Sequence, residues 1–368
     1  MKTRAAVLYG VGQPFVVEEL DLDPPKEHEV LVHLAASGVC HSDYHVVTGD
    51  MQVPLPQVMG HEGAGIVEKV GPGVTRVKPG DHVVMSFIPS CGFCYFCVNG
   101  MTQLCDLGAG ILQGPQLDGT YRLHKDGQDI GQTAMISTLS EWTVVPENSA
   151  VKIDDDYPLE RACLVACGVT TGVGAAINRA KVAPGSSVLV LGCGGVGTNV
   201  IQGARIAGAG MIIAADLLDF KLEMAMKFGA THTINNGRGN LIEKVMELTN
   251  GRGVDYAFEA IGTPVTVGLV VDAIRKGGTA VAIGVNSMAT ETIPVNPFVL
   301  VLWQKSLLGT LYGGSNPRTD IPRMLQLFRS GQLKLNELVT REYKLDQVNE
   351  AYGDMIAGKI IRGVIRYR

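Results

Sequence analysis

The sequence lacks the features that mark nucleic-acid-binding and membrane proteins. It has no basic excess, because 31 lysines and arginines stand against 36 aspartates and glutamates and leave a net charge of −5. With so little positive charge to attract a phosphate backbone, we expect no nucleic-acid partner. The sequence also contains no uncharged apolar run of about 18 residues, the length of a membrane span. The apolar stretch 297–303 is far shorter, so we expect no membrane partner.

The overall composition is that of a folded chain. Charged residues make up only 18% and hydrophobic residues 46%, which excludes a disordered protein. At about 100–200 residues per domain, 368 residues predict two or three domains. Residues 1–10 resemble a β-strand and have no apolar signal-peptide core, so we expect a cytoplasmic protein. The sequence has neither an internal repeat nor a low-complexity segment.

The pattern of apolar segments differs between two parts of the chain. In the first part, short apolar segments bounded by Gly, Pro or Asp predict strands, for example at 29–34, 65–70 and 81–85, and favour an antiparallel, barrel-like β unit. From Val169 onward, continuous apolar strands alternate with helical segments, which predicts a doubly wound parallel sheet. The tail, 320–368, returns to helix and strand with more charge. In the second part we expect strands at 187–191, 211–215, 231–234, 254–258, 279–283 and 306–311, and helices at 196–207, 221–228 and 241–248.

A glycine-rich turn follows the first strand of the second part. It reads Gly192-Cys193-Gly194-Gly195-Val196-Gly197 and leads into a predicted helix. Gly192 permits a tight turn, Gly194 lets the backbone approach a pyrophosphate, and Gly197 allows the helix to pack closely on the strand. The helix N-terminus offers free amide donors and partial positive charge to the phosphates. The alternative is a purely structural glycine turn.

An acidic residue at the end of the next strand supports a dinucleotide site. Asp216 lies about 20 positions after the last glycine, the spacing of a ribose-binding carboxylate. Its charge would repel a 2′-phosphate, and Leu217 and Leu218 offer no cation to offset that repulsion, so we expect NAD rather than NADP. Lys221 either lies beside the ribose or is a solvated helix residue.

Four of the eight cysteines form a tight cluster, Cys91, Cys94, Cys97 and Cys105. In a reducing compartment, four thiolates this close together suit a tetrahedral zinc with every position filled, which is a structural zinc site. An iron–sulfur cluster fits this spacing less well, and four unrelated free thiols are the remaining alternative.

A second possible metal group is dispersed along the chain. Cys40, His61 and Cys167 each lie in a glycine-rich or polar motif, but each is weak evidence alone, because a cysteine in an apolar segment is usually a core residue. We interpret Cys163 and Cys193 as such core residues.

Taken in order, these motifs resemble one family over essentially the whole chain. The order is Gly60-His61-Glu62, the four-cysteine lobe, residues 167–172 (CGVTTG), the glycine loop and Ile361-Arg362-Gly363. It is similar to that of the zinc-dependent medium-chain alcohol dehydrogenases. The four-cysteine spacing and the run Ser42-Asp43-Tyr44-His45 resemble the classical branch, which includes glutathione-dependent formaldehyde dehydrogenases. Other motifs resemble a bacterial subgroup of nicotinoproteins, in which the NAD does not dissociate and an external carrier reoxidises it.

The resemblance implies a catalytic zinc held by Cys40, His61 and Cys167, with the fourth position open. It also implies that Asp43 orients His61 and that Glu62 lies behind the zinc as an electrostatic modulator. For Glu62, the alternative is a buried acid paired with a cation.

The same resemblance assigns further residues to the cofactor and the proton path. Arg362 and His41 match positions near the pyrophosphate, with a surface salt bridge as the alternative for Arg362. Ser42 and His45 match a relay that carries the substrate proton through the ribose hydroxyls to solvent. The alternatives are a turn-forming serine and an ordinary surface histidine.

For the substrate channel, the resemblance places Phe87 beside the zinc. Around Gln132, Thr133, Ala134 and Met135 the chain has smaller and less aromatic residues than the family's alcohol enzymes, which indicates a roomier channel.

The architecture implied by the resemblance has two domains with the active site in the cleft between them. A GroES-like, β-rich catalytic domain would comprise 1–168 and 311–368, with the structural zinc lobe at about 88–108, and a Rossmann NAD-binding domain would comprise 169–310. The apolar stretch 295–311 resembles the family's subunit-joining edge, so we expect a homodimer or homotetramer.

The predicted function is therefore that of a zinc-dependent oxidoreductase. With two zincs per chain, it would move a hydride between a small-molecule alcohol and NAD, giving an aldehyde or ketone. The alternatives are a dehydrogenase of thiol–formaldehyde adducts, for which no cationic set is evident, and a nicotinoprotein. A non-enzymatic nucleotide-binding protein is a remote alternative, because the fold alone would allow it. The complete set of Cys40, His61, Cys167, Ser42 and His45 argues against that last alternative.

Overall fold

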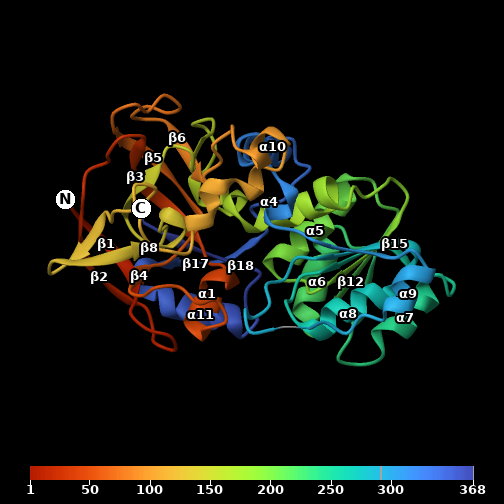
Figure 1. Cartoon of the computed structure of the whole chain (residues 1–368). Coiled ribbons are helices and arrows are strands. Elements are labelled where there is room, and N and C mark those ends of the chain that lie inside the picture. The colour runs from red at the N-terminus through yellow and green to blue at the C-terminus, as the bar shows by residue number, and fades with distance from the viewer. Residues whose placement is uncertain (291, 368) are drawn as a thin grey trace. The chain divides into compact units, whose positions relative to one another are not determined.

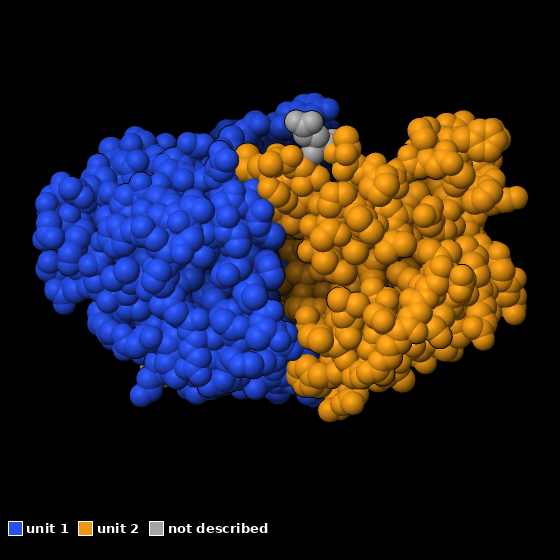
Figure 2. Space-filling model, turned by 90° about the horizontal axis from the view of Figure 1, so that it is seen from below, with its two compact units in different colours: residues 1–167, 316–368 blue, residues 168–315 orange. Residues whose placement is uncertain are grey.

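A computed structural model describes residues 1–290 and 292–367 and divides the chain into two compact units (Figures 1 and 2). Unit 1 comprises Met1–Cys167 and Asn316–Arg368, and unit 2 comprises Gly168–Ser315. The chain therefore leaves unit 1 one residue before the predicted domain boundary at 168 and returns five residues after the predicted boundary at 311.

Unit 1 contains a closed five-stranded barrel, which confirms a barrel-like β unit. The barrel closes because the last two residues of the first strand, Val7 and Leu8, pair with Val58 and Gln57. Most of the pairs are antiparallel, but β4 and β8 run parallel. Its interior is filled by aliphatic side chains such as Leu20. In barrel order the strands are β1 (Lys2–Leu8), β2 (Val16–Leu22), β7 (Leu123–Lys125), β8 (Gln128–Gln132) and β4 (Gln57–Val58).

A second sheet in unit 1 joins the two ends of the chain. The strand at its centre is longer than the predicted 29–34, running to Gly38, because alternate residues stay buried to its end. The C-terminal strand β18 pairs antiparallel with it, so Ile365 lies opposite Ser37. The order is β10 (Ala150–Lys152), β6 (His82–Met85), β5 (Gly63–Val70), β3 (Glu29–Gly38), β18 (Arg362–Arg366) and β17 (Val339–Lys344), and β9 (Trp142–Pro146) also pairs with β3.

Helices cover the sheets of unit 1. The helix α1 begins directly after Cys40 and ends at Gly49, whose φ of 81° is a left-handed conformation that glycine adopts without strain. The helix α11 packs beside α1 and shares an apolar cluster with it (Figure 1). The α-helices of unit 1 are α1 (His41–Thr48), α2 (Tyr95–Val98), α3 (Leu159–Ala162), α10 (Pro317–Arg329) and α11 (Val348–Ile356).

Unit 2 is built on the predicted doubly wound sheet, whose strand pairs are all parallel. The first strand, β11, lies in the middle and is fully buried, and the chain builds outward from it in one direction and then in the other. Ligands of such sheets bind at the carboxyl ends of the strands where this reversal occurs. The order is β13 (His232–Asn235), β12 (Met211–Asp216), β11 (Ser187–Leu191), β14 (Val254–Glu259), β15 (Ile274–Ala282) and β16 (Ser306–Gly309).

The helices of unit 2 include three that the sequence did not indicate, at Gly168–Gly174, Pro264–Ala273 and Pro297–Leu302. The helix α8 is apolar on most of its surface, so it shows no helical period, although a capping box of Thr263 and Thr266 marks its start. The helix α9 is a single short segment with no buried residue. The α-helices are α4 (Gly168–Gly174), α5 (Gly195–Ile206), α6 (Asp219–Phe228), α7 (Leu241–Leu248), α8 (Pro264–Ala273) and α9 (Pro297–Leu302).

Among the described residues, no single helix is long and apolar enough to cross a membrane. One bent pair, Leu159–Ala166 with Gly168–Arg179, passes that test by length and composition alone.

Candidate active site and metal centres

The four-cysteine lobe of unit 1 brings its thiols together. The sulfur atoms of Cys91, Cys94, Cys97 and Cys105 all lie within 4.8 Å of one another. The backbone amides of Phe93 and Cys94 donate to the Cys91 Sγ at 3.4 and 3.3 Å, and the Cys91 amide donates to the Cys105 Sγ at 3.2 Å. None of the described cysteines is in a disulfide. Four sulfurs with amide donors around them fit a closed tetrahedral zinc site.

The titration behaviour of these thiols also fits a bound cation. Burial opposes ionisation of Cys91, but the amides of Phe93 and Cys94 outweigh it and lower the pKa of Cys91 to about 6. Burial raises the pKa of Cys97, and it raises that of Cys105 to about 12. The Cys91 thiolate therefore forms readily, whereas Cys97 and Cys105 need a positive charge to hold them ionised.

An arginine from the C-terminal segment lies against this lobe. Arg318, in the first turn of α10, donates to the carbonyl oxygen of Ser90 and, at 3.0 Å, to the Asn148 side chain. Four thiolates exceed the charge of one divalent cation, so a nearby guanidinium offsets part of the excess negative charge. Sequence reasoning missed Arg318, because nothing near it in the chain points to the lobe.

The dispersed residues form a second group within unit 1. Ligand atoms of Cys40, His61, Glu62 and Cys167 all lie within 4.8 Å of one another. Cys40 is the residue before α1, His61 precedes β5, and Cys167 follows the short turn 163–166. All four side chains are buried or nearly so. Two thiols, an imidazole and a carboxylate so close together fit a zinc site with two sulfur ligands and one nitrogen ligand.

The electrostatics of this group favour a thiolate. A hydrogen bond with Cys167 is the largest influence on Cys40 and, against burial and together with the charge of His61, it lowers the pKa of Cys40 well below its ordinary value. Burial lowers the pKa of His61, but the charges of Asp43 and Cys40 outweigh it and raise that pKa to about 10. The pocket therefore stabilises a positive charge beside the Cys40 sulfur, which is the role of a metal cation.

Asp43 sets the orientation of His61. Its Oδ1 accepts from His61 Nδ1 at 3.1 Å and from the Gly60 amide at 3.0 Å. In the neutral ring that a bound metal requires, Nδ1 as the donor leaves the lone pair of Nε2 for the metal. Asp43 thus lies where the resemblance puts it.

Glu62 has a cation as its neighbour. Its carboxylate is completely buried and forms an ion pair with the guanidinium of Arg362, which begins β18. A side chain at Gly38 would overlap the Glu62 carboxylate, which explains the glycine there. Arg362 therefore lies inside unit 1 beside the metal group. A guanidinium has five N–H donors, which is more than one ion pair uses. The contact of Arg362 with pyrophosphate stays a prediction.

The remaining predicted residues of unit 1 lie on α1 and beside His61. The Ser42 Oγ is 3.7 Å from the Cys40 Sγ, and the ring of Phe87 meets that of His61 edge-on at 5.8 Å between centroids. His45 is 15% exposed and its Nδ1 lies 3.4 Å from an oxygen of Asp50. The exposed His41 has its ring centroid 5.1 Å from that of His45.

Hydrogen bonds within unit 1 hold the segment 132–135, which was predicted to line the substrate channel. The Gln132 side chain accepts from Gln116 at 2.9 Å and donates to Thr143 at 3.1 Å. The Thr133 hydroxyl bonds to the side chains of Gln57 and Met59, and Ala134 and Met135 have positive φ angles of 54° and 61°. Gln132 therefore uses its amide in internal hydrogen bonds, and two non-glycine residues beside it hold an uncommon backbone conformation.

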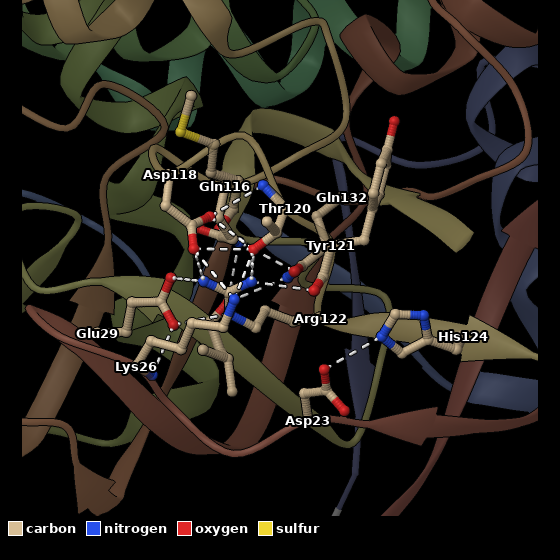
Figure 3. A network of polar contacts seen from close by, with 12 residues as sticks. Asp23, Lys26, Glu29, Gln116, Asp118, Thr120, Tyr121, Arg122, His124 and Gln132 are labelled. Atoms are coloured by element: carbon tan, nitrogen blue, oxygen red, sulfur yellow. Dashed lines mark hydrogen bonds and ion pairs between the residues drawn. The ribbon is translucent and has the colours of Figure 1, made fainter. Parts of the chain in front are cut away.

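A buried arginine anchors the loop before β7 (Figure 3). Arg122 is fully buried and makes two hydrogen bonds with Glu29, at 2.6 and 2.8 Å, and one with Asp118 at 2.9 Å. Lys26 and Thr120 join the same network. Paired in this way, the buried charge stabilises the junction between barrel and sheet, and a one-sided substitution would be costly.

In unit 2, the glycine loop has the geometry that its sequence predicts. Gly192 has a φ of 93°, and a side chain at Gly197 would overlap the carbonyl of Gly192. A Cβ at Gly194, by contrast, would meet nothing within 4 Å. Gly195 and Val196 begin α5 directly behind this open space. The loop therefore leaves room for a phosphate at the helix N-terminus.

Asp216 closes the other side of that loop. Its Oδ2 accepts from the Cys193 amide at 2.8 Å and its Oδ1 from the Leu218 amide at 3.1 Å. Leu217 and Leu218 are exposed, and Lys221 is half-buried. A carboxylate held at the carboxyl edge of β12 fits the ribose of a dinucleotide.

The two remaining cysteines, Cys163 and Cys193, are fully buried, and burial raises the pKa of each. They are unreactive core thiols.

Comparison with known proteins relates both units to one group of enzymes. The model of the alcohol dehydrogenase GroES-like domain matches residues 26–155, and that of the zinc-binding dehydrogenases matches residues 195–330. The chain is 48% identical to an NDMA-dependent alcohol dehydrogenase of Amycolatopsis methanolica, over 100% of this chain and 99% of that protein.

Solved structures of alcohol dehydrogenases also align with this chain over its whole length. A zinc-binding-domain alcohol dehydrogenase protein from Burkholderia ambifaria aligns with a TM-score of 0.94 at 36% identity, covering 100% of this chain and 99% of that one. The benzyl alcohol dehydrogenase of Acinetobacter calcoaceticus aligns with a TM-score of 0.94 at 34% identity, covering 100% of both chains.

Proposed function

Because the chain belongs to the zinc-dependent medium-chain alcohol dehydrogenase family, we propose that it interconverts small-molecule alcohols with their aldehydes or ketones, using NAD and two zinc ions per chain. One observation carries this proposal: Cys40, His61 and Cys167 converge in a buried group beside Asp43. Two thiolates and one imidazole are the protein ligands of a catalytic zinc that keeps one position for substrate. The four-cysteine lobe would hold the second zinc.

The residues of unit 1 divide the work of this reaction. When bound, zinc would act as a Lewis acid that lowers the pKa of an alcohol, and the nicotinamide would accept the hydride. Asp43 would hold His61 in the tautomer that a metal needs, and Phe87, whose ring meets that of His61 edge-on, would line the substrate channel. Ser42 would take the substrate proton at its Oγ while passing its own hydroxyl proton on toward His45, and His45, which is partly exposed, would release a proton to solvent.

Cofactor choice should depend on Asp216. Two like charges about 4 Å apart repel by about 4 kcal/mol at an effective dielectric constant of about 20, so the carboxylate disfavours a 2′-phosphate. For Asp216→Asn we expect the ratio of the dissociation constants of NADPH and NADH to fall at least about tenfold, since about 1.4 kcal/mol is tenfold. Fluorescence titration of cofactor-stripped protein measures both constants.

Asp219→Asn is the matched control, because Asp219 has the same charge three residues away but pairs with Arg238. It should leave the ratio unchanged. A wild type that binds NADPH as tightly as NADH would contradict the role of Asp216.

The same proposal includes a homodimer or homotetramer in the cytoplasm, where cysteine thiols stay reduced. The exposure of large apolar side chains on α9 supports association. Val301 is 69% exposed, and Phe298 and Leu302 are exposed to a similar degree. Apolar side chains gathered in this way are typical of a protein–protein interface.

We further propose that the NAD stays bound through many turnovers and is reoxidised by an external acceptor. The support is the 48% identity to a full-length relative whose name states dependence on NDMA. To test this, the protein is purified without added cofactor and denatured, and the released nicotinamide nucleotide is quantified. We expect about one NAD(H) per chain, with turnover that needs an artificial acceptor and ignores added NAD⁺ or thiol.

Two outcomes would contradict this proposal. Cofactor-free protein whose rate saturates with added NAD⁺ would make it an ordinary dehydrogenase with a dissociating cofactor. A rate that requires an added thiol would make it a dehydrogenase of thiol adducts. The assay should cover primary and secondary alcohols, so that substrate choice does not mask the result.

A further inference from the structure

A tyrosine from the C-terminal segment reaches the carboxylate that orients His61. Tyr352 lies on α11, and its hydroxyl donates to the Asp43 Oδ2 at 3.1 Å. The other oxygen of Asp43, Oδ1, accepts from His61 Nδ1 and from the Gly60 amide. A line of hydrogen bonds therefore runs from the core of α11 to a ligand of the proposed catalytic zinc.

The packing around Tyr352 holds this hydroxyl in place. The residue is only 2% exposed, and its ring lies 4.9 Å from that of Phe15 and 6.3 Å from that of Tyr44, which is on α1. Because α1 and α11 lie side by side (Figure 1), the ring is fixed between the two helices. Burial and the charge of Asp43 raise the pKa of Tyr352 well above its ordinary value, so the hydroxyl keeps its proton.

The hydrogen bond matters because Asp43 is itself buried, at 1% exposure. A buried charged oxygen that loses its donor has nothing to compensate for the water it lost on folding. Without the Tyr352 hydroxyl, the carboxylate would gain by turning toward another donor. Such a turn would weaken the hydrogen bond that Asp43 accepts from His61.

We propose that Tyr352 is a positioning residue for the Cys40–His61–Cys167 metal site, where its hydroxyl locks Asp43 and thereby slows the loss of the metal. This inference rests on the proposed function, in that it takes zinc to be the metal held there. Tyr352 would act on the site through Asp43.

The test compares zinc release from the wild type and Tyr352→Phe, which keeps the ring and removes the hydroxyl. Zinc leaving the purified holoenzyme is followed with a coloured chelator, and Cys40→Ser identifies the kinetic phase that belongs to the catalytic set. Partners that orient a metal ligand typically change metal affinity 10–100-fold. We expect release from the catalytic set to accelerate about tenfold, while release from the four-cysteine lobe stays unchanged.

Tyr44→Phe is the matched control, because it removes a hydroxyl from the neighbouring ring of the same stack, and it should release zinc at the wild-type rate. As a second readout, the visible absorption of the cobalt-substituted catalytic set should shift in Tyr352→Phe and not in Tyr44→Phe.

Three outcomes would overturn the inference. One is a catalytic phase within about twofold of the wild type in Tyr352→Phe. Another is equal acceleration of both phases, which would indicate general loosening of the fold. The third is a wild type with no zinc phase assignable to Cys40, which would contradict the proposed function as well, whereas the first two leave that function intact.

Discussion

Replacing Cys40 with serine should abolish alcohol oxidation while the fold survives. A serine hydroxyl stays protonated at neutral pH and cannot replace a thiolate, so the catalytic set loses one of its two sulfur ligands. Lewis-acid catalysis by a metal contributes several kcal/mol, and about 4 kcal/mol corresponds to a thousandfold in rate, so we expect turnover to fall about a thousandfold. The assay measures aldehyde formed per chain with cofactor and acceptor in excess.

Cys163→Ser is the matched control for this substitution. Cys163 is as buried as Cys40, but it lies outside both sulfur groups, so the variant should keep its activity even if it loses some stability. Circular dichroism should give wild-type secondary structure for both variants. A Cys40→Ser protein that retains more than about a tenth of the wild-type turnover would remove Cys40 from the chemistry.

Cys94→Ser should instead destabilise the protein. Structural zinc contributes about 10–16 kcal/mol of folding free energy in small zinc peptides, and a closed site that loses one thiolate forfeits part of it. We expect the free energy of unfolding to fall by a few kcal/mol, which for a chain of this size corresponds to a drop in Tm of roughly 10 °C. Thermal unfolding followed by circular dichroism measures the shift.

The control for Cys94→Ser is Tyr95→Ser, at an exposed neighbour in the same lobe. It removes more side chain but no ligand, so it should shift Tm by only a degree or two. An unchanged Tm in Cys94→Ser, or an equal loss in both variants, would contradict a structural metal in this lobe.

The elements that sequence predicted best are those whose burial pattern is continuous. The strands β11 and β12 are almost continuously apolar and buried because helices cover both faces of their sheet, and the helix α7 shows one apolar face. The strand β15 begins five residues before its predicted start, since the polar segment around Lys276 carries no apolar pattern. The helix α8 was missed because it is apolar on most of its surface and therefore shows no helical period.

The four-cysteine lobe and the glycine loop could be identified from sequence because their chemistry needs particular residues at short spacing. Cys91 to Cys105 and Gly192 to Gly197 are local motifs. The convergence of Cys40, His61 and Cys167 was available only through the resemblance to a family, because no local spacing joins them.

Long-range partners were beyond prediction from sequence. Tyr352 meets Asp43 because α11 packs on α1, and Arg362 meets Glu62 because β18 pairs with β3. Arg318 reaches Ser90 in the same way. In each case a C-terminal residue contacts a motif hundreds of positions earlier, and only the tertiary fold determines the pairing.

The zinc content of the active protein is the most direct test of a zinc-dependent reaction at Cys40, His61 and Cys167. Elemental analysis of the purified wild type should give about two zinc atoms per chain, and that of Cys40→Ser about one, because the closed four-cysteine lobe keeps its metal. An active wild type with one zinc or none per chain, or a Cys40→Ser protein with the same zinc content as the wild type, would contradict a zinc-dependent reaction at Cys40, His61 and Cys167.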